Sequence, residues 1–329
     1  MSRWELADEH GPAQQEMRQA FCQTVSELME ANDRVVMLEA DLGSASGTLT
    51  TIGRSHPGRY FNVGISEANM MGMAGGLSLR GFVPFVHTFA PFASRRAADQ
   101  VYLEGAYARN SFTIYASDPG VCAEHNGGTH SSYEDVSLMR AIPEMEVYHP
   151  ADPVQFAWLV RQLAERPRVH YVRAARKKVA QIYQAGSTFE IGRGNLLADG
   201  ADLVLVAAGD LLGEALAVRE ALAERGVGAA VVDMFTLKPF DEELLLSVAA
   251  GKQLVVTMEN HSVYGGLGGI VAEVLATAGL GVPLRRIGVN DQFGQVGTID
   301  FLKQTYGLTV DHTLEVIGQA DGFASVSAN

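Results

Sequence analysis

Residues 60–89 read YFNVGISEANMMGMAGGLSLRGFVPFVHTF, and this single stretch already indicates a fold class. The apolar runs at 60–64 and 83–89 have the length and the β-branched and aromatic content of buried strands. The segment between them is rich in Met, Ala and Gly and is typical of a tightly packed helix. A strand, a helix and a second strand in this order favour the parallel sheet of a doubly wound α/β fold.

The same alternation continues along the whole chain. In the first half we predict further strands at 34–40, 111–117, 145–151 and 169–173, and helices at 14–31, 92–108 and 152–165. In the second half we predict strands at 203–209, 229–235, 254–260 and 284–289, and helices at 211–225, 240–250, 266–279 and 298–306. The predicted fold class is therefore α/β, with two doubly wound domains and mainly parallel sheets, at 12–180 and 201–325. Residues 181–200 form the predicted linker, with a short strand at 188–192.

Composition narrows the class of protein. The 329 residues are 47% hydrophobic and include 25 Lys and Arg against 38 Asp and Glu, a formal net charge of −13. An acidic surface argues against nucleic acid and anionic membranes as main partners. Cys22 and Cys122 show no metal-binding spacing and no disulfide pattern, which fits a reducing compartment. The polar N-terminus does not resemble a signal peptide, and no apolar stretch approaches the ~20 residues that span a bilayer, so we expect a cytoplasmic protein.

Glu67 is the residue that most needs a functional explanation. It stands between the apolar strand at 60–64 and the helix that follows, at a turn where its side chain is expected to be buried. A buried carboxylate is costly unless a partner pairs with it or its pKa shifts. We therefore treat Glu67 as a candidate site residue and ask which group it meets.

A Gly-rich loop follows the predicted strand at 111–117 and contains Glu124, His125, Asn126 and His130. Loops after the carboxyl ends of parallel strands are where α/β folds keep their sites. The spacing of these residues fits no standard zinc pattern, and a solvated loop with surface histidines is the simpler local interpretation.

Three further motifs have two interpretations each. Phe89 and Phe92 flank a strand-to-helix junction and are, on local grounds, core residues. Arg173 and Arg176 end another strand, where two guanidiniums hold a phosphate or form a solvated basic surface. The GGLGG run at 265–269 lies between a strand and a helix but lacks the full dinucleotide-binding spacing, so close helix packing explains it equally well.

Together, these pieces resemble one family. The first half resembles the pyrimidine-binding domain of transketolases and their thiamine-diphosphate-dependent relatives, through GISEANMMGMAGGL (64–77), TFAPFASRRAADQV (88–101), GGTHSSYEDVSLMRAIPEMEVYHPAD (127–152) and HYVRAAR (170–176). The second half resembles the transketolase C-terminal domain, through DMFTLKPFDEELL (233–245), TMENHSVYGGLGGIVAEVL (257–275) and GVNDQFGQVGT (288–298). The resemblance covers about residues 12–320, and the ordered set of motifs is highly specific.

The resemblance implies an activity and a partner. Single-chain transketolases have an additional N-terminal domain that binds the cofactor diphosphate through Mg²⁺ or Ca²⁺, with a Gly-Asp-Gly stretch and an Asn-Asn pair, and this sequence contains neither motif. The chain therefore resembles the C-terminal subunit of a split transketolase. We expect a 2+2 heterotetramer with an N-terminal pyrophosphate-binding subunit, which would supply the metal contact, with thiamine diphosphate as cofactor. The implied reaction moves a two-carbon ketol unit from a ketose, phosphorylated or otherwise anionic, to an aldose.

The resemblance also implies roles for single residues at the cofactor. Glu67 matches the glutamate that hydrogen-bonds to N1′ of the aminopyrimidine ring. Phe92 matches the residue that stacks on this ring, and Phe89 lines the same pocket. His130 matches a catalytic histidine that contacts the donor ketose. Asp41 matches an aspartate close to the cofactor.

The expected substrate contacts include departures from the family pattern. Arg173 matches a substrate-phosphate arginine, Arg176 follows on the same strand end, and Arg18 resembles a second phosphate-binding arginine. Asn126, preceded by His125, stands where glycolytic-type members have an aspartate. Ala45 replaces a phosphate-binding serine, and Arg95 replaces an aromatic residue. We therefore expect the cofactor chemistry to be kept and the sugar to differ from the usual substrates.

Three alternatives remain open on the sequence. One is the β-subunit of the E1 component of a 2-oxo acid dehydrogenase, which shares the two-domain layout. Another is half of a 1-deoxyxylulose-5-phosphate synthase. A third is a non-catalytic binding subunit, which has no need for a carboxylate in an apolar turn. The Gly-rich loop with His130 and the paired arginines favour work on phosphosugars over the first alternative.

Overall fold

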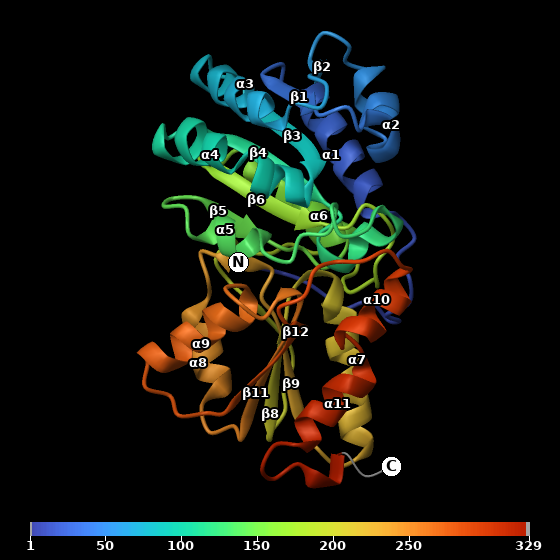
Figure 1. Cartoon of the computed structure of the whole chain (residues 1–329), viewed down its shortest axis with the longest axis vertical. Coiled ribbons are helices and arrows are strands. Elements are labelled where there is room, and N and C mark those ends of the chain that lie inside the picture. Colours follow the sequence, from blue (N-terminus) through green and yellow to red (C-terminus); the bar gives the residue numbers. More distant parts are fainter. Residues whose placement is uncertain (1, 327–329) are drawn as a thin grey trace.

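The computed structural model describes residues 2–326, and in that part of the chain two sheets follow one another along the molecule (Figure 1). The first has seven strands in the order β10-β5-β6-β4-β3-β1-β2: β1 (Val35–Glu39), β2 (Tyr60–Asn62), β3 (Val83–Phe89), β4 (Phe112–Ser117), β5 (Glu146–Tyr148), β6 (Val169–Ala174) and β10 (Thr236–Lys238). The second has five strands in the order β12-β11-β8-β9-β7: β7 (Asn195–Ala198), β8 (Leu203–Ala207), β9 (Ala229–Asp233), β11 (Leu254–Ser262) and β12 (Leu284–Val289). Antiparallel pairing within these sheets occurs between β10 and β5 and between β7 and β9. The predicted α/β class with mainly parallel sheets is confirmed.

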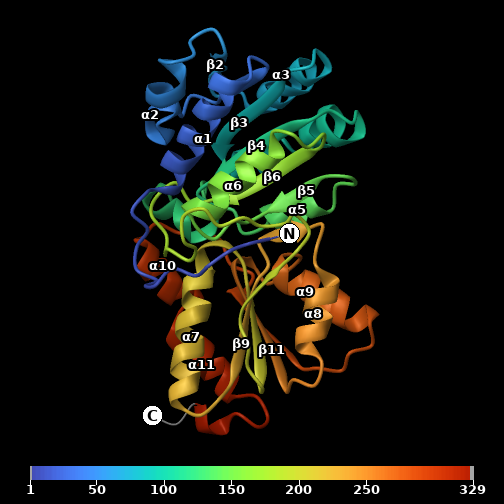
Figure 2. The same cartoon turned by 180° about the vertical axis from the view of Figure 1, so that it is seen from behind.

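Helices cover both faces of each sheet (Figures 1 and 2). On the first sheet, α1 (Met17–Ala31) and α6 (Pro153–Leu163) pack together on one face, and α3 (Glu67–Leu79) packs on the other. On the second sheet, α7 (Leu212–Glu224), α10 (Ile299–Tyr306) and α11 (Val310–Gly318) lie opposite α8 (Glu242–Ala249) and α9 (Leu267–Thr277). The shorter helices are α2 (Gly43–Ser46), α4 (Ala98–Gln100) and α5 (Asp135–Arg140).

The core follows from this layering. Strands β1, β4, β6, β8 and β9 are buried at every position, as a parallel sheet with helices on both faces requires. An aromatic cluster fixes α1 and α6 to the first sheet, because the Phe21 ring lies 4.6 Å from that of Tyr115 and 5.8 Å from that of Phe156. These contacts hold the carboxyl ends of the strands in a fixed frame.

The two halves are joined by more than a linker. Strand β10 comes from the second half but pairs with β5 of the first sheet, with Thr236 opposite Tyr148. The N-terminal segment crosses the junction between the sheets (Figure 2) and forms isolated bridges that pair Arg3 with Thr188 and Pro12 with Ala180. The sequence alone did not predict either connection.

Two details of the predicted elements are wrong. The short strand expected at 188–192 is absent, because Thr188 makes only the bridge to Arg3 and Gly192 turns the chain with a φ of 83°. The helix expected over 92–108 is broken at Ala97 into wider π-helical turns at Phe92–Arg96 and Val101–Tyr107. Among residues 2–326, no helix has the combined length and apolar character that crossing a bilayer requires.

Candidate active site

The carboxyl ends of the first sheet's central strands bring most of the predicted site residues to one edge. Asp41 follows β1, Phe89 ends β3 and Arg176 follows β6, and they are joined by Asp118, which was not predicted and follows β4. Parallel strands place their carboxyl ends together, which is where ligands bind in doubly wound folds. The edge therefore assembles a site from segments more than 130 residues apart in the chain, since residues 41 and 176 both contribute to it.

Glu67 begins α3 at this edge, with 1% of its surface exposed. Its Oε2 atom accepts a hydrogen bond of 2.7 Å from Nη1 of Arg96, and its Oε1 atom accepts one of 3.4 Å from the Thr88 hydroxyl. A carboxylate in the first turn of a helix is also favoured by the helix dipole. The group that Glu67 meets in this chain is thus a guanidinium.

Phe89, Phe92 and His130 form an aromatic cluster beside Glu67. The rings of Phe89 and Phe92 lie 6.0 Å apart, and the His130 ring lies 5.2 Å from the first and 5.1 Å from the second. The Gly-rich loop after β4 carries His130 to this place. The pKa of His130 is lowered by burial and then by the positive charges of Arg176 and Arg96, which favours the neutral imidazole at pH 7.

Two arginines lie on the faces of the same rings. The guanidinium carbon of Arg96 is 4.1 Å from the centre of the Phe92 ring, and that of Arg176 is 4.7 Å from the centre of the Phe89 ring. Arg176 also forms an ion pair with the buried Asp118. The cluster therefore combines flat apolar surface with cations at its rim.

Arg18, Ala45 and Arg176 meet at the start of α1. The backbone N–H of Arg18 donates to the carbonyl oxygen of Arg176 at 3.0 Å, and its guanidinium donates to the carbonyl oxygen of Ala45. Arg18 is further paired with Glu16 at 2.7 Å. Asp41 lies on the exposed loop after β1, where it accepts a hydrogen bond of 3.1 Å from the Asn62 amide.

The residues predicted to depart from the family pattern differ in how tightly the structure holds them. Asn126 and His125 are exposed on the turn that precedes the Gly-rich segment. Arg95, by contrast, is tied to the loop itself: its Nη2 atom donates to the carbonyl oxygens of Thr129 at 3.2 Å and Ser131 at 3.4 Å. Arg95 thus holds the chain on both sides of His130.

Arg173 also lies at the carboxyl end of β6, but its side chain is enclosed, which does not fit the phosphate contact predicted for it. Its side chain is 1% exposed and forms an ion pair of 2.8 Å with Asp135. Its Nη2 atom donates to the Asn260 carbonyl oxygen at 2.9 Å, in the junction between the two halves. In this structure the Arg173 guanidinium is therefore engaged by the chain's own groups, whereas the Arg176 guanidinium lies over the Phe89 ring.

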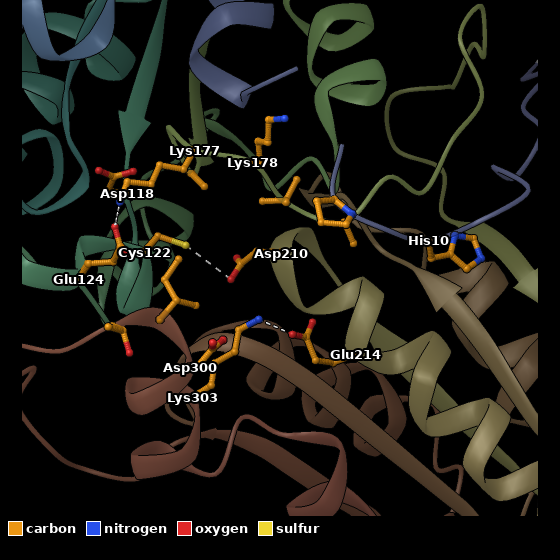
Figure 3. A pocket seen from close by; sticks show the side chains of 16 residues that line it. His10, Asp118, Cys122, Glu124, Lys177, Lys178, Asp210, Glu214, Asp300 and Lys303 are labelled. Atoms are coloured by element: carbon orange, nitrogen blue, oxygen red, sulfur yellow. Dashed lines mark hydrogen bonds and ion pairs between the residues drawn. The ribbon is translucent and has the colours of Figure 1, made fainter. Parts of the chain in front are cut away.

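A cavity of about 490 Å³ lies where the two halves meet (Figure 3), and the aromatic cluster does not line it. Asp118 and Glu124 line it from the first half, and Glu214 and Lys303 line it from the second. Lys303 pairs with Glu214, and Lys177 pairs with Glu124. Because the lining contains more carboxylates than lysines, the cavity is poorly suited to an anionic ligand.

Two family models match the chain. The transketolase pyrimidine-binding domain matches residues 13–181, and the transketolase C-terminal domain matches residues 192–313. The chain belongs to the transketolase family. Both halves of the resemblance read from the motifs are confirmed.

Individual transketolase relatives share this two-domain extent. The chain is 45% identical over 293 residues to the 6-deoxy-6-sulfo-D-fructose transketolase subunit SqwH of Clostridium sp. strain MSTE9, covering 89% of this chain and 90% of that protein. It is 34% identical over 292 residues to an apulose-4-phosphate transketolase subunit of Phocaeicola vulgatus, covering 88% and 93%. A solved structure described as "Split gene transketolase, inactive beta4 tetramer" matches with 38% identity and a TM-score of 0.82, over 94% of this chain and 96% of that one. The chain is thus built as the C-terminal subunit of a split transketolase.

The side chains at the edge fit the pyrimidine end of the transketolase cofactor. An aminopyrimidine needs a carboxyl group for its ring nitrogen and flat apolar surface for its faces. Glu67 supplies the first and the rings of Phe89 and Phe92 the second, on adjoining elements. Within residues 2–326, no group of three or more His, Cys, Asp or Glu side chains is arranged to hold a metal ion.

The GGLGG run has a structural explanation in this transketolase subunit. Glu259, within β11, accepts hydrogen bonds from the backbone N–H groups of Leu267 at 2.7 Å and Gly268 at 2.8 Å, at the start of α9. A Cβ atom on Gly266 would lie 2.1 Å from the Glu259 carboxylate. The helix N-terminus, where a nucleotide phosphate would bind, is therefore filled by the chain's own carboxylate.

Sequence analysis missed Arg96 and Asp118 as site residues. A signal for Arg96 was present, because it follows Phe92 by four residues and so lies on the same side of a helical turn. The signal for Asp118 was its place directly after a predicted strand.

Proposed function

We propose that this chain is the C-terminal subunit of a thiamine-diphosphate-dependent transketolase that moves a two-carbon ketol unit from an anionic ketose to an aldose. The observation that carries the proposal is the buried Glu67 carboxylate beside the Phe89, Phe92 and His130 rings. We further propose that activity requires an N-terminal subunit that binds the diphosphate and its Mg²⁺ or Ca²⁺, in a cytoplasmic 2+2 heterotetramer.

The chain's own residues then take the following roles. Glu67 shares a proton with the pyrimidine ring nitrogen, and Phe92 and Phe89 hold the ring in place. The bound cofactor supplies the electron sink for cleaving the carbon–carbon bond. His130, neutral at pH 7, accepts a proton from a ketose hydroxyl or donates one after protonation. Asp41 stands near the cofactor at the boundary with the partner.

The anionic end of the ketose is assigned to Arg176 and Arg18, with Asn126 on the opposite loop. The backbones of the two arginines hydrogen-bond to each other at the start of α1, and a guanidinium matches the geometry of a phosphate or sulfonate group. One relative is named for a 6-sulfo sugar and another for a 4-phosphate sugar, so related subunits handle both anions. We propose that the ketose carries one of these two groups.

Exposed apolar side chains on and around α3 suit a partner subunit. Ile65, Leu79 and Tyr107 are 75%, 75% and 79% exposed, on and around α3 and the turn Val101–Tyr107 that packs against it. Ile65 directly precedes the Glu67 turn and Leu79 lies at the far end of α3, so the exposed apolar side chains run along the helix, as is typical of an obligate interface.

The proposed function is tested by mixing the chain with a candidate N-terminal subunit, thiamine diphosphate and Mg²⁺. Two-carbon transfer is then measured from a panel of ketoses that carry a phosphate, a sulfonate or neither. We expect transfer only in the mixture and only from an anionic ketose. Decarboxylation of a 2-oxo acid without transfer from any ketose would instead indicate an E1-type dehydrogenase subunit.

Replacing Arg176 by Met should raise the KM for the anionic ketose roughly ten- to hundred-fold, because a hydrogen bond to a charged group is lost. Cofactor affinity should change much less. The measurement is the ratio of KM values for an anionic and a neutral ketose, and Arg161→Met, in an exposed pair with Glu27, is the matched control. An unchanged KM would place the anion elsewhere.

A further inference from the structure

The Arg96 guanidinium makes the two contacts that the proposed function assigns to the aminopyrimidine. Its Nη1 atom donates to Glu67 Oε2 at 2.7 Å, and its central carbon lies 4.1 Å from the centre of the Phe92 ring. A guanidinium is planar, delocalised and able to stack on an aromatic face while it donates hydrogen bonds. In shape it therefore resembles the ring that this place would receive, and in hydrogen bonding it resembles that ring when the ring nitrogen carries the proton shared with Glu67.

We propose that Arg96 is a placeholder that occupies the aminopyrimidine position in the cofactor-free chain and is displaced when the cofactor binds. This inference rests on the proposed function. Both groups call on the Glu67 carboxyl group and on the Phe92 ring, so they compete for one place. Arg96 thus controls how readily the site accepts its cofactor.

The placeholder explains how Glu67 can be buried before the cofactor arrives. The Glu67 side chain is 2% exposed, and an isolated buried carboxylate would be strongly disfavoured. Arg96 compensates this charge from within the chain. The site can therefore fold with its carboxylate in place.

Arg96 is also free to leave. Its side chain is 44% exposed, and within residues 2–326 its guanidinium hydrogen-bonds to Glu67 alone. The neighbouring Arg95 differs, because it is held by two carbonyl oxygens of the Gly-rich loop and by Glu134. Rotation of Arg96 toward solvent breaks one charge-assisted hydrogen bond and uncovers Phe92, whereas rotation of Arg95 would release the loop.

Displacement has a measurable consequence for affinity. A site that is open for only part of the time binds with an affinity reduced by that fraction. Removing a partner that makes one charge-assisted hydrogen bond at a half-exposed position should therefore tighten binding of the aminopyrimidine roughly ten-fold. The same substitution should lower the stability of the free chain, because Glu67 loses its partner.

The test is calorimetric titration of the full chain with thiamine, which carries the aminopyrimidine. Arg96→Met should bind thiamine roughly ten-fold more tightly than the wild type. Arg95→Met, which removes the same charge one residue away, should not. If Arg96→Met does not fold, Arg96→Gln gives the same comparison with a neutral side chain. In the wild type, the NMR signals of the Arg96 guanidinium should shift on addition of thiamine.

Equal or weaker binding by the Arg96 variant, or no binding at all, would overturn the placeholder. The proposed function is judged separately, by two-carbon transfer in the wild-type complex. If transfer occurs and the Arg96 variant does not tighten, only the placeholder fails. If transfer does not occur from any ketose, the proposed function fails whatever the titrations show.

Discussion

Replacing Glu67 by Gln should lower two-carbon transfer by the reconstituted complex roughly 10²- to 10⁴-fold, the range expected for loss of an acid–base group. The amide has nearly the shape of the carboxyl group, so the buried site should still fold, but it cannot share a proton with the ring nitrogen. The measurement is kcat at saturating cofactor and ketose. Cofactor affinity, measured by calorimetry, should change much less than kcat.

The control for this substitution is Glu146→Gln. Glu146 is also buried and also paired with an arginine, Arg166, at 2.7 Å, but it begins β5 and so lies at the opposite, amino-terminal edge of the sheet. The Glu146→Gln variant should have a lower free energy of unfolding than the wild type and an unchanged kcat. Turnover within a few-fold of wild type in the Glu67 variant would remove the role assigned to that residue.

Much of the fold could be predicted because its signals are local. Buried strands such as 112–117 and 203–207 are short apolar runs, and the helices between them have their own periodicity. The site edge followed from one rule, that parallel strands end together, and from the burial argument at Glu67. That argument needs no knowledge of the rest of the structure.

The features that could not be predicted from the sequence depend on contacts between segments that are distant in the chain. Arg173 and Arg176 lie three residues apart at one strand end and look equivalent in the sequence. Contacts with Asp135 from another part of the first half and with Asn260 from the second half enclose Arg173 and leave Arg176 at the site. The pairing of β10 with β5 is non-local in the same way. No local sequence pattern predicts which arginine is enclosed or which strand β10 pairs with.

Replacing Arg173 by Met should lower the free energy of unfolding by about 3–5 kcal/mol, because it leaves the buried Asp135 carboxylate without its partner. The measurement is urea unfolding of the free chain, and the KM for the anionic ketose in the complex should change less than in the Arg176 variant. In the double variant with Asp135→Asn, most of the stability should return, since neither charge remains. Arg161→Met, in an exposed pair, should cost less than about 1 kcal/mol.

The pH dependence of the stability difference between the wild type and Arg173→Met shows which interaction is lost. Burial alone would raise the pKa of Asp135, but the charges of Arg173 and His261 hold it below its ordinary value. In the wild type, the contribution of the pair is therefore present above the ordinary carboxyl pKa and is lost only as the pH falls through the lowered one. In Arg173→Met, the hydrogen bond from the Tyr171 hydroxyl still opposes burial, but the guanidinium charge is gone and burial lowers the pKa of His261 to about 4, so that His261 is largely neutral between pH 5 and 8. The pKa of Asp135 therefore rises, and its carboxyl group takes up a proton as the pH falls. The stability deficit should thus be largest near pH 8 and shrink toward pH 5. A deficit that stays constant over this range would mean that lost packing of the Arg173 side chain, not an uncompensated charge on Asp135, is what destabilises the junction.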